Sequence, residues 1–293
     1  MAVQLNKPEE IITLGVDEIV IQQYEPFEGQ NIQRMPELLA RGRVPIPASE
    51  VMKRRVAVGE QLPDWGNSWF DTSDLVAYDA KGRSNNVKFI LTVDNKGNLT
   101  EVGKRALSWI NPDMPLVNYA IDLSQGNLYD TLRGEGVIEV SREKLGEVEG
   151  RLKRGEVIDS KPWRILARHP DEVPVGFAED KSLLPEYVDW VASKTGQGEN
   201  MGVYFDANGD KAKMRAWFVY RLGGRSGALG RYYLVYGNGR FVGLAPEAQI
   251  ALAKGIRERT LDARVKSDLD EGRGFEYNGR VYVPTSAENV EVK

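Results

Sequence analysis

The chain has 293 residues, of which 41% are hydrophobic and 28% charged, and its formal net charge is −4. This length fits one large or two small globular domains, and the mild acidity argues against a general nucleic-acid coat protein. The lack of Cys excludes disulfides, thiolate nucleophiles and Cys-ligated metals, and the single histidine, His169, excludes multi-His metal sites. We therefore expect no metal and no cofactor.

The start of the chain lacks the charged and then apolar pattern of a signal peptide. No apolar run approaches the roughly 18 residues that a transmembrane helix needs. The sequence therefore predicts a soluble protein without membrane contact, located in the cytoplasm or assembled there as a virion component.

The first part of the chain mixes short strand and helix signals. β-Branched residues at 11–24 predict one or two strands. Further along, we expect helices at 36–41 and 48–59, a hairpin of strands 74–79 and 87–94, a helix from Thr100 to Ile110, a strand at 116–123 and a short helix at 124–133.

Two segments of this part carry residue types found in binding sites. Residues 63–70 hold two Trp and one Phe, which either clamp a ligand by stacking or fill a satellite core under a loop. Residues 41–55 hold five basic side chains against Glu50, a second and weaker positive patch or a solvated helix face.

The middle of the chain contains a weak point in its helical pattern. Residues 142–154 are amphipathic, but Gly146 and Gly150 weaken the predicted helix, and we place a hinge there. The flanking elements are an extended segment at 137–140, a strand at 163–168 and a helix at 183–194. This organisation predicts regions 1–134 and 135–293, as two domains or as one.

The most unusual stretch is 211–240, which contains seven Lys and Arg and no Asp or Glu. Its formal charge of +7 leaves about −11 for the rest of the chain. Six aromatic residues share the stretch, and Asn-Gly at 208–209 is typical of a tight turn after a strand at 201–206.

Alternation predicts that strand 213–222 has one apolar and one basic face. A loop at 223–230 leads to a second strand at 231–236, in which Tyr232, Leu234 and Tyr236 face the core. With a third turn at 237–239, the result is an antiparallel meander whose basic, partly aromatic face is expected to meet water, because burying unpaired charge is costly.

The side chains expected on this face or in its loop are the candidate nucleic-acid-binding residues. They are Lys213, Arg215, Trp217, Arg221, Arg225, Arg231 and Tyr233. Sheets that bind single-stranded nucleic acid combine positive charge with flat rings for base stacking. We therefore expect a non-enzymatic protein that binds single-stranded nucleic acid or another polyanion.

Two alternatives remain open. In the first, acidic groups of the same chain neutralise this face, or a second subunit covers it, as in a homo-oligomeric structural or assembly protein of viral or mobile-element type. In the second, the chain is a carboxylate-based metal-dependent hydrolase, for which Asp171 with Glu179 and Lys181 gives a poor nuclease-like match.

The order of the predicted elements shows no regular alternation of strand and helix. It predicts an α+β fold with mainly antiparallel sheet, in which the C-terminal meander is followed by a long helix at 246–270 and a terminal hairpin at 275–283.

Overall fold

The computed structural model describes residues 11–14, 19–83, 86–145, 152–196, 201–206, 209–223, 226–245, 275–277 and 280–282. The chain divides into two compact units. Unit 1 consists of Met1–Leu5 and Pro26–Leu244, and unit 2 of Asn6–Glu25 and Ala245–Lys293. The predicted boundary at residues 134 and 135 thus falls inside unit 1.

The described part of unit 2 contains two short antiparallel hairpins. One pairs β1 (Ile11–Leu14) with β2 (Ile19–Gln22), and the other pairs β14 (Phe275–Tyr277) with β15 (Arg280–Tyr282). Both agree with the strands expected from the sequence. The helix predicted at 246–270 lies outside the described residues.

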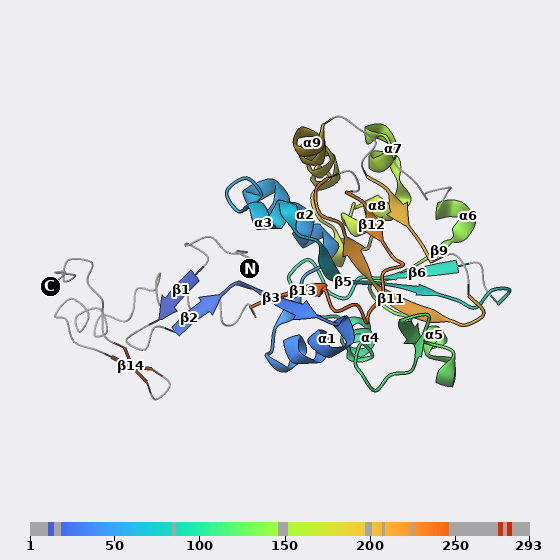
Figure 1. Ribbon diagram of the computed structural model, residues 1–293, viewed down its shortest axis with the longest axis horizontal. Coiled ribbons are helices and arrows are strands. Elements are labelled where there is room, and N and C mark those ends of the chain that lie inside the picture. The colour runs from blue at the N-terminus through green and yellow to red at the C-terminus, as the bar shows by residue number, and fades with distance from the viewer. Residues whose placement is uncertain are drawn as a thin grey trace. The chain divides into compact units, whose positions relative to one another are not determined.

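Unit 1 is built on a mixed, mostly antiparallel sheet whose central strands are β5 (Phe70–Tyr78) and β11 (Lys213–Val219) (Figure 1). They pair antiparallel, with Lys213 opposite Tyr78 and Val219 opposite Phe70. The other strands are β3 (Tyr24–Gly29), β4 (Val44–Pro45), β6 (Asn86–Ile90), β7 (Leu116–Val117), β8 (Ala120–Asp122), β9 (Val137–Ser141), β10 (Val203–Tyr204), β12 (Ala228–Leu229) and β13 (Gly239–Leu244).

Helices cover both faces of this sheet (Figure 1). On one face, α1 (Asn31–Ala40) and α4 (Glu101–Ser108) pack on an apolar cluster that includes Leu75, Ile90 and Met214. The remaining helices are α2 (Ala48–Val58), α3 (Pro63–Asn67), α5 (Leu128–Thr131), α6 (Arg142–Leu145), α7 (Arg154–Asp159), α8 (Lys161–Leu166), α9 (Leu183–Thr195) and the 3-10 turns Gln125–Asn127 and Val175–Phe177. No helix of the described residues combines the length and the apolar character needed to cross a membrane.

The prediction of an α+β fold is confirmed, and so are the elements with strong local signals. Strands β5 and β6 form the expected hairpin. Helix α4 begins where Thr100 accepts a hydrogen bond from the backbone N–H of Gly103 at 2.9 Å. Helix α2 and helix α9 also lie within a residue or so of their predicted bounds.

Three local predictions are wrong. Residues 163–168 lie mostly in α8, because Pro162 fits the first turn of a helix and Trp163 and Leu166 bury one side of it. Residues 116–123 form the hairpin of β7 and β8 rather than one strand. Helix α1 begins at Asn31, with Pro36 inside it, because Ile32, Met35 and Leu38 form a buried stripe.

The predicted meander is also wrong, because its strands do not lie side by side. Strand β5 lies between β11 and β13, and β10 pairs parallel with β12 instead of forming a hairpin with β11. Strand β12 falls in the predicted loop at 223–230, whereas residues 231–236 form turns instead of a strand. Hydrogen bonds to strands far away in the sequence therefore outweigh the local turn signals.

Both faces of β11 are buried along its whole length. The expectation that Lys213, Arg215 and Trp217 meet water is therefore wrong, since each is at most 1% exposed. Trp217 packs on Phe89 with ring centroids 5.5 Å apart and on Phe205 at 5.4 Å. The face of β11 that was predicted to be basic and exposed is therefore covered by other parts of the chain.

We predict that Trp217→Ala lowers the free energy of unfolding by about 3–5 kcal/mol, because it leaves a large cavity in a packed core. Trp69→Ala is the matched control, since Trp69 is partly exposed and is expected to cost about 1 kcal/mol. Urea unfolding measures both values. Equal costs for the two variants would contradict the buried position of Trp217.

Candidate functional site

The predicted basic face is neutralised within the chain. The carboxylate of Asp206 accepts from Arg215 Nε at 3.0 Å and Nη2 at 2.9 Å, and lies 2.8 Å from Lys213 Nζ. One acidic group thus serves two buried cations. For Lys213 and Arg215 the structure thus agrees with the alternative in which acidic groups of the same chain neutralise the basic face.

Of the other predicted site residues, Tyr233 contacts Arg215, whereas Arg221 and Arg231 lie at the surface. Arg221 and Arg231 are exposed, and the guanidinium of Arg231 lies 4.9 Å from the ring centroid of Tyr204. Arg225 lies outside the described residues. Tyr233 is half-buried, and its ring centroid is 5.3 Å from the guanidinium carbon of Arg215.

Four tyrosines form a cluster at the surface, which we call the tyrosine patch. Its members are Tyr119, Tyr232, Tyr233 and Tyr236. The ring centroids of Tyr119 and Tyr233 are 4.9 Å apart, those of Tyr233 and Tyr236 5.0 Å, and those of Tyr232 and Tyr236 5.3 Å. Tyr119 is 56% exposed and Tyr236 44%, so the patch presents large aromatic area to solvent.

Tyr119 reaches the patch from a strained turn. It follows Asn118 in the two-residue connection of β7 and β8, and their φ angles are +60° and +49°. Two positive φ angles in such a connection define a type I′ turn, in which Gly is favoured at the second position. A tyrosine there costs on the order of 1 kcal/mol. Strain of this kind is often kept where a side chain has a function.

The buried guanidinium of Arg215 holds both halves of the patch. It donates to the backbone carbonyls of Asn118 at 2.6 Å, Tyr119 at 3.3 Å and Tyr232 at 3.0 Å. The ring of Phe218 stacks on Tyr232 with centroids 4.1 Å apart. Strand β11 therefore positions two loops that are far apart in the sequence.

Beneath the patch lies a buried carboxyl group, Asp71 of β5. Its Oδ2 accepts the backbone N–H of Arg240 at 2.7 Å, at the end of the segment that carries the patch. Its Oδ1 has no partner in hydrogen-bond geometry, and neither does the neighbouring amide of Asn31. Burial raises the pKa of Asp71 to about 7, opposed by the backbone N–H and the charge of Arg240.

Burial also changes the pKa of a tyrosine hydroxyl of the patch. Burial, and next the charge of Asp71, raise the pKa of Tyr232 to about 12. Tyr232 therefore stays protonated at neutral pH and can donate as well as accept a hydrogen bond.

Among the described residues, no three His, Asp or Glu side chains are placed to hold a metal ion. The residues of the nuclease-like match have other partners. Asp171 accepts from Arg164 Nη2 at 2.9 Å, and Glu179 accepts from Lys53 Nζ at 2.6 Å. This geometry gives no support to a metal-dependent reaction at these carboxylates.

Comparison with known proteins places the fold. No family model and no curated protein matches the chain. A solved structure described as "Accommodation of massive sequence variation in Nanoarchaeota by the C-type lectin fold" aligns with a TM-score of 0.50 and 16% identity, over 76% of this chain and 98% of that one. The fold of this chain is similar to the C-type lectin fold. At 16% identity the similarity concerns the fold and not the function.

Sequence reasoning did not find most of the patch within this C-type lectin-like fold. The sequence predicts Tyr232 and Tyr236 in the core, because it predicts a strand at 231–236. It predicts Tyr119 in the middle of a strand, since Asn118-Tyr119 lacks the Gly that marks a type I′ turn. Of the four tyrosines, the sequence indicates only Tyr233 as a site residue, because it lies beside basic residues.

We predict that Asp71→Asn changes how stability depends on pH. The folded state keeps the proton of Asp71 up to about pH 7, while the unfolded chain releases it near 3.8, so wild-type stability falls as pH rises between these values. The difference in free energy of unfolding, Asp71→Asn minus wild type, should rise by about 2–3 kcal/mol from pH 5 to pH 8.

The measurement is urea unfolding at several pH values, with Asp189→Asn as control. Asp189 is an exposed carboxylate whose bond to Arg154 lowers its pKa, so its replacement should give no such rise. A difference between Asp71→Asn and wild type that stays constant with pH would contradict the raised pKa of Asp71.

Proposed function

We propose that this chain is a non-catalytic assembly module that associates with a second copy of itself through the tyrosine patch. The observation that carries the proposal is the exposure of Tyr119 on a turn whose backbone disfavours it. Tyrosine is enriched in the cores of protein interfaces, where its ring gives contact area and its hydroxyl gives hydrogen bonds.

The pairing of basic side chains in the stretch 211–240 with carboxylates supports a protein partner rather than a polyanion. Lys211 pairs with Asp122 at 2.9 Å, and Arg240 pairs with Glu28 at 2.8 Å. Together with the neutralisation of Lys213 and Arg215 by Asp206, this removes most of the cationic track that phosphate groups would need.

The chemistry of the patch also suits association with its own copy. In a two-fold interface the same surface meets itself, so a surface with a strong net charge would repel its copy. Aromatic rings and tyrosine hydroxyls carry no net charge and do not repel their copies, and each hydroxyl can both donate and accept a hydrogen bond. Two copies of the patch can therefore pack against each other and form hydrogen bonds.

We predict that Tyr119→Gly and Tyr236→Ser each weaken self-association at least about tenfold. Glycine relieves the strained turn, so Tyr119→Gly should keep the free energy of unfolding within about 1 kcal/mol of wild type. Sedimentation velocity over a wide range of concentration measures association, and urea unfolding measures stability.

The matched control is Val175→Ser, which removes an exposed apolar side chain, 88% accessible, away from the patch. It should leave the dissociation constant of the dimer unchanged. A wild-type chain that stays monomeric at all concentrations would overturn the proposal, and so would equal effects of the control and the patch variants.

A second candidate function is binding of single-stranded nucleic acid, favoured by the exposure of Arg221 and Arg231 within the basic stretch. If it holds, retention on an oligonucleotide should fall as salt rises. It should also fall on replacing both residues by Gln while Tyr119→Gly changes it little. Retention that is absent, or insensitive to both salt and the double variant, argues against this candidate.

A further inference from the structure

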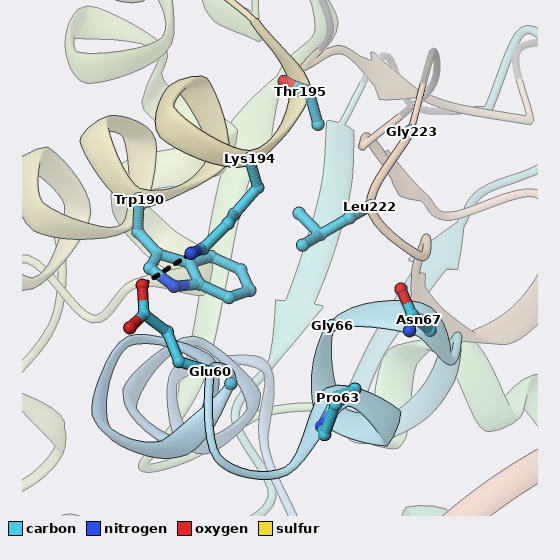
Figure 2. Close-up of a pocket in the computed structure, with 10 residues that line it drawn as sticks. Glu60, Pro63, Gly66, Asn67, Trp190, Lys194, Thr195, Leu222 and Gly223 are labelled. Carbon is cyan, nitrogen blue, oxygen red and sulfur yellow. Dashed lines mark hydrogen bonds and ion pairs between the residues drawn. The ribbon is translucent and has the colours of Figure 1, made fainter.

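Unit 1 contains a cleft of about 620 Å³ outside the tyrosine patch (Figure 2). It lies where the end of α2, the short helix α3 and the C-terminal half of α9 meet the residues that follow β11. Its volume is in the range of small-molecule sites. Figure 2 shows side chains from all these segments around the opening.

The cleft has an apolar floor built around two glycines. A Cβ at Gly59 would lie 2.5 Å from Cζ2 of Trp190, so the indole occupies the space of a side chain. A Cβ at Gly66 would lie 3.0 Å from Cδ1 of Leu222 and 3.6 Å from Cη2 of Trp190. Trp190 and Leu222 thus adjoin over Gly66 and offer a surface on which a flat ring can lie.

Polar groups line the rim. Lys194 Nζ donates to Glu60 Oε1 at 2.5 Å, and this pair lies on one side of the cleft, beside the indole of Trp190 (Figure 2). The Lys194 ammonium holds the pKa of Glu60 below its usual value. The amide of Asn67 lies on the other side of the opening. The Glu60–Lys194 pair by itself adds no net charge.

A buried cation lies directly behind the floor. Arg55 is fully buried and donates to the carbonyls of Trp65 at 2.9 Å, Ser68 at 2.8 Å and Tyr220 at 2.8 Å, and to the hydroxyl of Tyr187 at 2.6 Å. These residues adjoin the lining: Trp65 and Ser68 flank Gly66 and Asn67, and Tyr187 stacks on Trp190 with centroids 6.1 Å apart.

No carboxylate of the described chain binds this guanidinium. A buried positive charge without a negative partner creates a field that water screens poorly. The cleft therefore combines an apolar floor, a buried guanidinium behind that floor and a lysine at its rim.

We propose that this cleft binds a small planar organic anion. Its ring lies on the floor of Trp190 and Leu222. Its acidic group meets Lys194 and displaces Glu60 from that lysine. The field of Arg55 favours the anion over a neutral or cationic ring of the same size.

The test uses three ring compounds of matched size: naphthalenesulfonate, naphthalenecarboxamide and naphthylmethylammonium. The readout is the indole N–H resonance of Trp190, one of six tryptophans, assigned with Trp190→Phe. We expect the sulfonate to shift this resonance in a saturable way and the carboxamide to bind about tenfold more weakly. The ammonium compound should not bind.

Variants of the ion pair sharpen the test. Lys194→Met should weaken binding of the sulfonate about tenfold, and Glu60→Gln should strengthen it about threefold by freeing the lysine. Asp189→Asn breaks a matched exposed ion pair on the same helix and should change binding less than about twofold. Equal affinity for the three compounds, or equal binding in Lys194→Met and wild type, would overturn the proposal.

Discussion

The hydrogen bonds of the buried Arg215 guanidinium hold in place the two loops that carry the tyrosine patch. Arg215 sits on a central strand, is neutralised by Asp206, and donates to backbone carbonyls of two separate loops. These loops have few ladder hydrogen bonds of their own, and unpaired buried carbonyls would cost 1–3 kcal/mol each, roughly. A planar group with five donors can satisfy several of them from one point.

The same solution recurs elsewhere in unit 1. Arg55 serves three carbonyls around α3, and Arg168 joins the carbonyl of Val93 to the buried carboxylate of Asp74. Both are fully buried. Arg55, Arg168 and Arg215 thus act as internal donors for irregular backbone, which helps a sheet of short strands to carry long connections.

The sequence predicted those elements whose causes are local. The cap at Thr100, the hairpin of β5 and β6, and the helix α9 all follow from neighbouring residues. The candidate site could not be predicted in the same way. Alternating basic residues normally face water, and nothing in the sequence indicates that Asp206 folds back over Arg215. The partners of the patch residues lie about a hundred residues apart in the chain.

The pairing of β5 with β11 has a consequence for biosynthesis. The two central strands are separated by about 140 residues, so β5 leaves the ribosome long before its partner is made. During that interval the edge of β5 that later pairs with β11 remains unpaired, although α1, α2 and α4 have already been made. The nascent chain is then exposed to misassembly at this edge, and completion of the sheet waits for β11, β12 and β13, a slow and non-local step.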